Sequence, residues 1–547
     1  MNIFCFFANI TNMNIKNFFN NLTKYTIPYN FSIMNNNFDS APAPIKKEPK
    51  VFSNITENLD YIKSKYNVLI NSDIKIREFN MFANNKNHKC FIIYIDGLVD
   101  TVSINEFVLE PLMTGKLRFN KPIDTNLLEY VDNCLLPQNS VKKIEDFKEI
   151  LSGINMGDCL LFIDTLNVAF GIDVKKFQQR SISVPENESV IKRPQEGYVE
   201  NLRTNTSLLR RIVNNENLII ENVSVGTISQ TRCSVCYMQN IANSDLVAEV
   251  KYRLNNLDID SLLSSGQLEQ LIEYEEGFGI PQVLSTERPD KCAKYLFQGR
   301  VVVLVNGNPY ALIMPATIED FLFSPEDTNL RPLFANFLRG IRIFAALITL
   351  LLPGIYMAIT SFHQELLPTE LLFSILTARE NVPFPIILEL LLMEISFELI
   401  REASLRVPSL IGSSISIVGA LILGDAAVNA GIVSPTLIII VAITGIASFA
   451  IPDFSFGFHA RVFRFWFIAL GFVAGFLGIG VGFFIYVTML CSLKSFGVPY
   501  TTPIAPSYNT KGNGFFIPPV WKREYRASFI SPKKGKAQDA ISMKWKI

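Results

Sequence analysis

The chain has little of what a catalytic or metal site requires. It contains 3 histidines in 547 residues, and its one short cysteine pair, Cys233 and Cys236, lacks the second pair or the histidines that a zinc site needs. A nucleophile elbow, a phosphate-binding glycine loop and a metalloprotease helix are also absent from the sequence. We therefore expect no catalytic, cofactor or metal site and no enzyme, and we interpret the two cysteines as ordinary strand residues.

Some isolated polar residues could serve an unknown enzyme, but no cleft partner can be named for them. We interpret them as structural ion pairs or interface residues. They are Glu196, Asn201, Arg203, Arg288 and Asp290.

An excess of one charge is also missing, because 50 Lys and Arg balance 50 Asp and Glu. No nucleic-acid partner is expected. The C-terminal segment is locally basic, because ten Lys or Arg follow position 493 and the acidic residues there are Glu524 and Asp539. Basic residues beside an apolar run indicate the cytoplasmic side of a membrane. Arg339 and Arg342 precede the first such run, so both flanks are predicted to be cytoplasmic, with an even number of crossings between them.

Long uncharged apolar runs are what the chain does have, at 343–362, 407–424, 426–452 and 465–493. A membrane helix needs about 20 such residues. The sequence therefore predicts an α+β soluble N-terminal region of two subdomains followed by an α-helical multi-pass membrane domain. The predicted parts are a disordered extension (1–50), subdomain 1 (51–185), subdomain 2 (186–335), a transmembrane domain of four or five helices (336–493) and a basic cytoplasmic tail (494–547).

Short apolar runs at 91–95, 160–163 and 301–305 predict strands in the soluble region. The segments that end them, YIDG, FIDT and LVNG, indicate either a repeated strand-turn unit or chance similarity. Asn306-Gly307 predicts a hairpin with a type I′ turn. Leucine spacing predicts a helix over 257–276, and the polar segment 183–197 predicts a linker between the subdomains.

Two features stand out in the apolar runs. Pro353 interrupts the first run and predicts a kink, because proline removes a backbone hydrogen bond. Four glycines in the last run recur at spacings of four, three and four, which predicts one glycine face for close helix packing. They are Gly471, Gly475, Gly478 and Gly482.

The segment 383–406 is apolar yet charged, and Glu394, Glu398 and Glu402 recur in it every four residues. This spacing predicts one acidic stripe along a helix, with Arg401 paired to Glu398. Ionisable groups at membrane depth face water or a partner, so the stripe is a candidate ion path. The alternative is an amphipathic helix in the membrane interface, with its acids in water.

Several longer segments carry a family resemblance. They are EGYVENLRTNTSLLRRI at 196–212, TERPDK at 286–291, FHQELLPTELL at 362–372, ARENVPFP at 378–385, REASLRVPSLIGSSISIVGALILGDAAV at 401–428 and SFGVPYTTPIAP at 495–506. In their order and spacing the chain resembles the GerA family of spore germination proteins, specifically the A subunit of nutrient germinant receptors.

The resemblance implies a multi-pass protein of the spore inner membrane. Its implied partners are a transporter-like B subunit that binds the nutrient, a lipoprotein C subunit and further copies of itself in an ion-conducting ring. A sporulation AF-type paralogue that amplifies ion release and a solute transporter remain the alternative functions. Four or five crossings are too few for the inverted repeats that transporters usually show.

Overall fold

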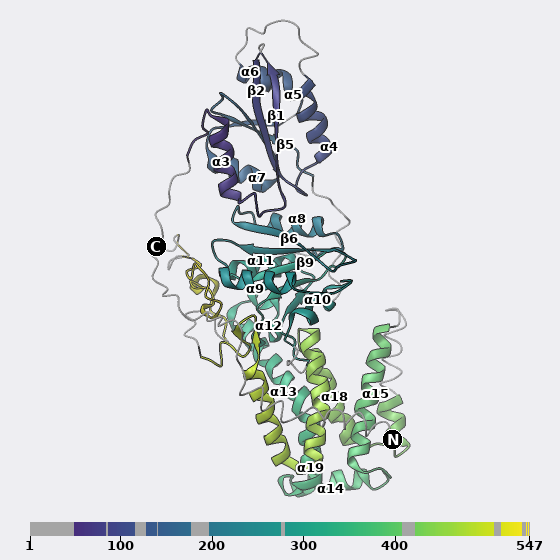
Figure 1. Cartoon of the computed structure of the whole chain (residues 1–547). Coiled ribbons are helices and arrows are strands. Elements are labelled where there is room, and N and C mark those ends of the chain that lie inside the picture. Colours follow the sequence, from purple (N-terminus) through teal and green to yellow (C-terminus); the bar gives the residue numbers. More distant parts are fainter. Residues whose placement is uncertain are drawn as a thin grey trace.

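The structure, a computed structural model, describes residues 49–83, 86–114, 127–138, 140–176, 196–274, 279–406, 422–507 and 516–538, with 543 and 545. Nearly all of the predicted extension 1–50, the linker 183–197 and the apolar run 407–424 lies outside the described residues. Two sheet-containing units and a group of long helices follow one another along the molecule (Figure 1).

The first unit is a five-stranded antiparallel sheet in the order β1-β2-β4-β5-β3. Its strands are β1 (Ile74–Ala83), β2 (Lys86–Ile95), β3 (Val141–Ile144), β4 (Asp158–Ile163) and β5 (Ala169–Asp173). Alternation along β2 feeds two cores, because Phe91 and Ile93 pack with α3 (Ile55–Tyr66) and α7 (Phe147–Met156). Ile92 packs on the other face with a helical segment. That segment comprises α4 (Thr101–Ile104), η1 (Asn105–Leu109), α5 (Glu110–Thr114), α6 (Leu127–Tyr130) and η3 (Val131–Leu135).

The second unit repeats this topology, with the strand order β6-β7-β9-β10-β8. Its strands are β6 (Leu218–Val225), β7 (Thr231–Met238), β8 (Leu284–Thr286), β9 (Val301–Val305) and β10 (Ala311–Met314). Its helices are α8 (Leu202–Ile212), α9 (Ser244–Asn255), α10 (Ser265–Ile272), α11 (Pro289–Gln298) and α12 (Ile318–Leu322). In each unit the fourth strand follows a helix that ends at a left-handed glycine, Gly157 or Gly299.

The shared topology shows which of the three similar segments, YIDG, FIDT and LVNG, occupy equivalent places in the two units. FIDT and LVNG end β4 and β9, which occupy equivalent places in the two sheets. YIDG ends β2, a second strand, so its likeness to the other two is not structural equivalence.

Two local predictions in the second unit need correction. The β9–β10 hairpin exists, but residues 306–310 separate its strands, and of its Asn-Gly pair only Gly307 has a positive φ. The side chain of Asn306 instead accepts a hydrogen bond from Leu202 N at the start of α8. The predicted helix 257–276 is confined to α10, because the segment before it pairs with the loop after β6, with Thr227 N donating to Ile259 O.

A buried arginine joins the two units. Arg210 of α8 pairs with Asp73, which precedes β1, at 2.9 Å, and its side chain has no exposed surface. It also donates to the backbone carbonyl of Leu218 and to the side chain of Asn71. Because a buried guanidinium requires such partners, the contact fixes unit 1 on unit 2.

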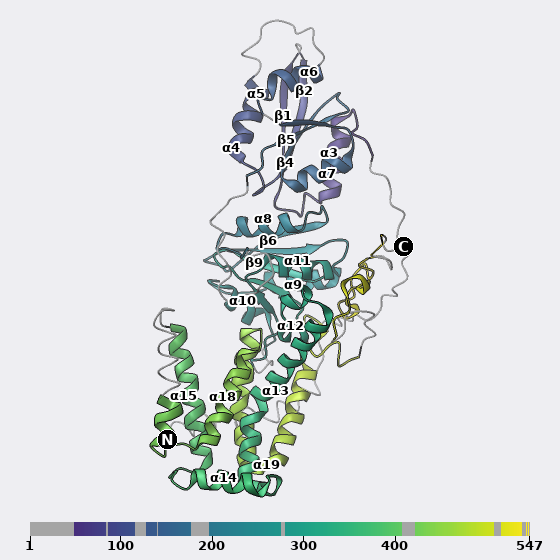
Figure 2. The same ribbon diagram turned by 180° about the vertical axis from the view of Figure 1, so that it is seen from behind.

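The helical region lies on the far side of the second unit, away from the first (Figures 1 and 2). It comprises α13 (Pro332–Phe362), η6 (Gln364–Leu366), α14 (Thr369–Arg379), α15 (Ile386–Arg406), η7 (Ile422–Ala426), α17 (Ala427–Asn429), α18 (Pro435–Phe449) and α19 (Phe454–Ser492). Among the described residues, α13 and α19 are long and apolar enough to cross a membrane, and α18 is a shorter apolar helix. Both ends of the region meet the second unit, since Ser495 just after α19 donates to Gln282 O and accepts from Ala316 N.

The long helix α19 is a hairpin, which the sequence did not predict. Its backbone leaves helical geometry at Ala474 and at Gly475, where φ is 58° and ψ is −139°. Tyr486 lies 5.5 Å from Phe463 between ring centroids, whereas a straight helix would separate these residues by about 35 Å. The chain therefore reverses at 474–475, and the segments 454–473 and 476–492 run antiparallel. A straight helix of 39 residues would be about twice as long as the hydrocarbon core is thick.

The four glycines thus do not share one face of one helix, although each lies at a close contact. A Cβ on Gly471 would be 2.6 Å from Gly354 O of α13, beside Pro353. One on Gly478 would be 2.3 Å from Leu470 O in the other half of the hairpin. Gly482 likewise faces the Leu470 side chain at 2.4 Å. Pro353 lies inside a continuous α13, and the kink there stays a prediction.

We predict that Gly475→Ala destabilises the helical region by about 1–3 kcal/mol, because only glycine adopts its backbone conformation without strain. Gly478→Ala should be at least as damaging, since a backbone carbonyl occupies the position of the new methyl group. Gly480→Ala is the matched control, because a Cβ there meets nothing within 4 Å. Thermal unfolding of the detergent-purified chain measures the effect, and equal midpoints for all three variants would contradict the hairpin geometry.

Candidate functional site

The candidate site is a cluster of buried charges where α15 meets α19. Arg464, on the first half of α19, lies 3.0 Å from Glu394 Oε2 through its Nη1 atom. Its Nη2 donates to Glu398 Oε1 at 2.9 Å. The side chains of Arg464 and Glu394 have no exposed surface, and that of Glu398 is 23% exposed. One guanidinium therefore bridges two carboxylates that are one helical turn apart.

Two further arginines complete the cluster. Arg401 pairs with Glu398 Oε2 at 2.6 Å, which confirms the predicted pair within α15. Arg461, three residues before Arg464, lies 3.7 Å from Glu398 Oε1. Three guanidiniums thus surround two carboxylates and compensate their charge away from water.

A third carboxylate of α15 is used differently. Glu389, near the start of the helix, has a 1% exposed side chain and pairs with Arg379 at 3.5 Å. It also accepts a hydrogen bond from the backbone nitrogen of Ser434, which precedes α18. The side chain of Ser434 makes no capping hydrogen bond at the start of α18. Glu389 therefore supplies an acceptor for that helix end.

The acidic stripe therefore does not lie open along α15. Glu394 and Glu398 face the arginines of α19, and Glu402 alone of the three is exposed. The interfacial alternative, with all of these acids in water, is wrong for Glu394, because Arg464 and the packed helices exclude solvent from it. The assignment to an ion path stays a prediction.

The arginines of α19 that pair with these glutamates were not predicted from the sequence. Arg461 and Arg464 are three residues apart and immediately precede an apolar run, so they lie on one face of the helix that the run begins. The available signal was that two arginines three residues apart on one helix can pair with two glutamates four residues apart on another. The spacing alone does not show that these two helices, which lie far apart in the chain, are in contact.

The isolated polar residues of the soluble region have structural roles. Arg288 Nε donates to Asp290 at 3.0 Å, Arg203 pairs with Asp96 of the first unit, and Glu196 pairs with Arg211. Asn201 caps α8 by accepting from Thr204 N. Cys233 and Cys236 lie in β7 with their side chains in separate cores. Burial raises the pKa of the Cys233 thiol to about 12, as expected for a buried strand cysteine.

Fold and site together define a class: two α+β units of one topology, joined to apolar helices of membrane-spanning length that enclose paired charges. The family model "Bacillus/Clostridium GerA spore germination protein" matches residues 60–529. The chain therefore belongs to the GerA family of spore germination proteins, as its motifs indicated.

Individual relatives agree with the family. Spore germination protein KA of Bacillus subtilis is 40% identical over 490 residues, which is 89% of this chain and 88% of that protein. Spore germination protein B1 of the same species is 36% identical, covering 86% and 96%. Spore germination protein GerLA of Bacillus cereus is 35% identical, covering 80% and 88%.

Among solved structures, the chain is similar to the N-terminal domain of the A subunit of the Bacillus megaterium spore germinant receptor GerK3. The identity is 30% and the TM-score is 0.39, over 50% of this chain and 99% of that domain.

We predict that Arg464→Met destabilises the chain by about 3–5 kcal/mol, because it leaves Glu394 buried without its counter-charge. Adding Glu394→Gln to Arg464→Met should recover most of that loss, because Glu394 then carries no charge and Glu398 keeps Arg401 and Arg461. Thermal unfolding in detergent compares the two variants. A double variant no more stable than Arg464→Met alone would show that the pairing is not what Arg464 contributes.

Proposed function

We propose that this chain is the A subunit of a nutrient germinant receptor and that its copies assemble in the spore inner membrane into an ion conduit. A transporter-like B subunit would bind the nutrient, and a lipoprotein C subunit would complete the receptor. The soluble units and both flanks of the helical region would face the cytoplasm.

The observation that carries the conduit proposal is the row of carboxylates on α15, an otherwise apolar helix. Charged groups at membrane depth are rare and mark ion pathways or internal pairs. In the structure, Arg464 is paired with both Glu394 and Glu398. An open state would separate α15 from α19 and turn these acids toward water, where rings of acids from several copies attract cations.

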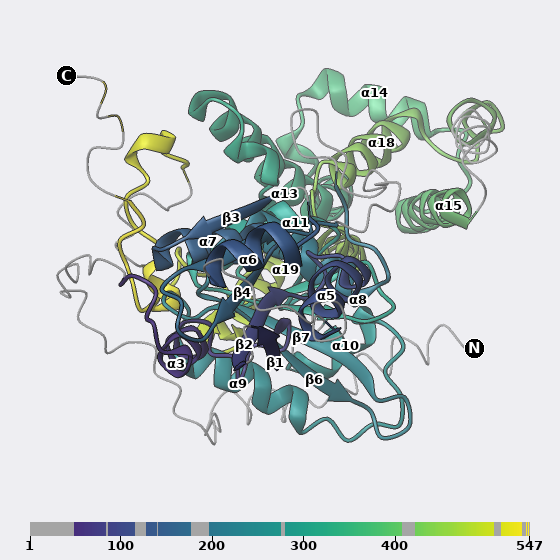
Figure 3. The same cartoon turned by 90° about the horizontal axis from the view of Figure 1, so that it is seen from above.

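The outer face of α15 supports an assembly of copies. Its exposed apolar residues follow spacings of four, three and four, which form one stripe along the helix. They are Leu388, Leu392, Ile395 and Leu399. Seen from above, α14, α15 and α18 project beyond the outline of the sheets (Figure 3). Within the part of the chain that the structure describes, the stripe is therefore free to face lipid or a neighbouring copy.

A topology test follows from the two ends of the bundle. In a Cys5→Ser and Cys491→Ser background, Lys522→Cys should be labelled only from the cytoplasmic side, because it lies beside the second unit. Glu370→Cys, exposed in α14 at the opposite end, should be labelled only from the other side. Membrane-impermeant maleimide on intact and inverted vesicles distinguishes them. Labelling of both from the same side would contradict a membrane-spanning bundle.

The conduit test uses spores that carry the receptor with Glu394→Gln and Glu398→Gln together. We expect cation release after nutrient addition to fall about tenfold or more if these acids concentrate cations in the path. Glu370→Gln is the matched control, because that residue is exposed in α14, outside the acidic stripe. Potassium release is measured by flame photometry at receptor levels equalised by immunoblot. Wild-type release from the double variant would remove the acids from the ion path and leave the family membership intact.

A further inference from the structure

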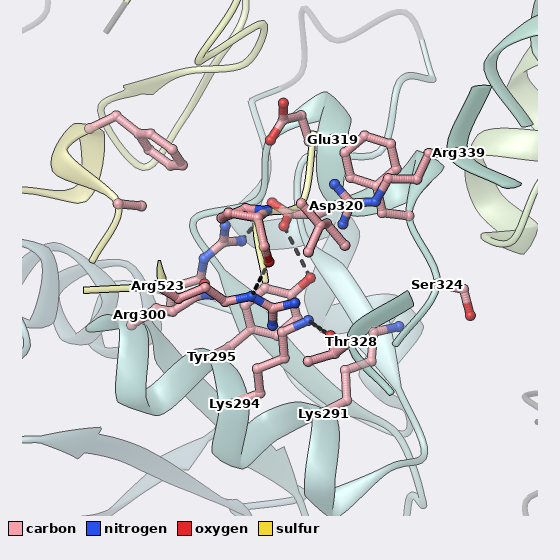
Figure 4. A pocket seen from close by; sticks show the side chains of 16 residues that line it. Lys291, Lys294, Tyr295, Arg300, Glu319, Asp320, Ser324, Thr328, Arg339 and Arg523 are labelled. Atoms are coloured by element: carbon pink, nitrogen blue, oxygen red, sulfur yellow. Dashed lines mark hydrogen bonds and ion pairs between the residues drawn. The ribbon is translucent and has the colours of Figure 1, made fainter. Parts of the chain in front are cut away.

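A cavity of about 140 Å³ lies where the second unit, α13 and the C-terminal segment 516–538 meet (Figure 4). Its wall comes from α11, α12, the loop with η5 (Pro325–Thr328), the start of α13, and the segment with η8 (Val520–Lys522) and η9 (Ser528–Ile530). A water molecule takes up roughly 30 Å³. The cavity is therefore large enough for a small polyatomic ion with some of its water.

Cationic side chains dominate the wall. Five cations face two carboxylates there, and they come from three separate parts of the chain. The cations are Lys291, Lys294, Arg300, Arg339 and Arg523, and the carboxylates are Glu319 and Asp320.

Asp320 is already neutralised within the fold. Arg300 donates to its Oδ2 at 2.6 Å, and Thr317 donates to the same oxygen from its nitrogen and its hydroxyl. The Arg300 guanidinium holds the pKa of Asp320 below its usual value against the opposing effect of burial. Arg339 has its own partner, since it pairs with the buried Asp327 at 3.1 Å.

Lys294 and Arg523 are the cations whose described bonds go to uncharged groups. Lys294 Nζ donates to Thr328 Oγ1 at 2.7 Å, and Arg523 Nε donates to Pro518 O at 3.1 Å. Neither has a carboxylate within 4 Å among the described residues. Burial, together with Arg339 and Arg523, lowers the pKa of Lys294 to about 8. These like charges are held together against their mutual repulsion.

Glu319 does not supply the missing negative charge. Burial and the neighbouring Asp320 raise its pKa to about 7, so it is largely neutral in slightly acidic conditions. Its buried Oε1 and the buried Nε of Arg300 have no hydrogen-bond partner among the described residues. A protonated Glu319 can therefore donate to an oxygen atom placed in the cavity.

We propose that this cavity binds a phosphate-type oxyanion, held chiefly by Lys294 and Arg523. Lys and Arg together suit such a group, because each phosphate oxygen accepts several charge-assisted hydrogen bonds. The anion would join the C-terminal segment to α11. Asn336 of α13 already binds Ile517 of that segment, donating to its carbonyl and accepting from its nitrogen, so the anion would add a second attachment. The site does not depend on ion conduction.

Two sources of phosphate fit the location. Free phosphate can enter from the cytoplasmic side. A phospholipid headgroup can enter from the membrane, because Arg339 lies four residues, or about 6 Å, before the uncharged run of α13 begins. The chemistry of recognition is the same for both.

The test uses the full chain in neutral detergent free of phosphate. Inorganic phosphate is titrated at constant ionic strength against chloride while thermal unfolding is followed. Native mass spectrometry of the same protein, extracted from membranes, measures retained anionic phospholipid. The test variant is Lys294→Gln with Arg523→Gln. The matched control is Lys522→Gln with Lys534→Gln, which removes two exposed charges of the same sign.

For free phosphate, we expect a saturable rise in the unfolding midpoint and at least about tenfold weaker affinity in the test variant only. For lipid, we expect retained anionic phospholipid that is lost from the test variant only. In the absence of anion the test variant should unfold no earlier than wild type, because a repulsion has been removed. The proposal is overturned if wild type shows neither response, or if the control loses it equally.

Discussion

The helical region depends on one interaction, the pairing of Arg464 with Glu394 and Glu398. One guanidinium without exposed surface holds two carboxylates of α15, so α15 cannot leave α19 without exposing charge to an apolar environment. The cost of such a separation is far larger than that of parting two apolar helices. Beside this charged cluster, apolar residues of α13, α15, α18 and α19 form one core. The ionic contact therefore specifies which helix faces which, and apolar packing fills the rest.

The second unit is attached to the helices more firmly than a linker would allow. One continuous apolar core runs from β6 and β9 through Phe321 to Phe456 and Phe467 of α19. The hairpin β11 (Lys494–Ser495) and β12 (Val498–Pro499) returns from α19 into the other core of the same unit. Residues 516–538 then pack back on it, with Arg526 donating to Phe297 O at the end of α11. The described residues of the predicted basic tail, 494–507 and 516–538, thus pack on the second unit.

Elements defined by local pattern were predictable, and elements defined by distant contacts were not. The strands at 91–95, 160–163 and 301–305 exist because buried apolar runs between turns have few alternatives. The α19 hairpin was missed because glycines at helical spacing suit a packed face as well as a reversal, and only the backbone angles at Gly475 distinguish them. Likewise Glu394 was found but its partner was not, since 70 residues separate Glu394 from Arg464 in the chain. The type I′ turn failed because Asn306 is used by α8.

The matched strand order of the two units has a consequence for how such a chain arises. Two copies of one αβ arrangement in tandem, each with a helix and a left-handed glycine before the fourth strand, are the mark of a duplicated segment. Among the described residues, the second copy shares a core with the helices and binds the segment that follows them. The first copy meets the rest of the molecule through the second, with Arg210 at their contact. Duplication thus left the second copy held on two sides, by the helices and by the first copy, and the first copy held at its contact with the second.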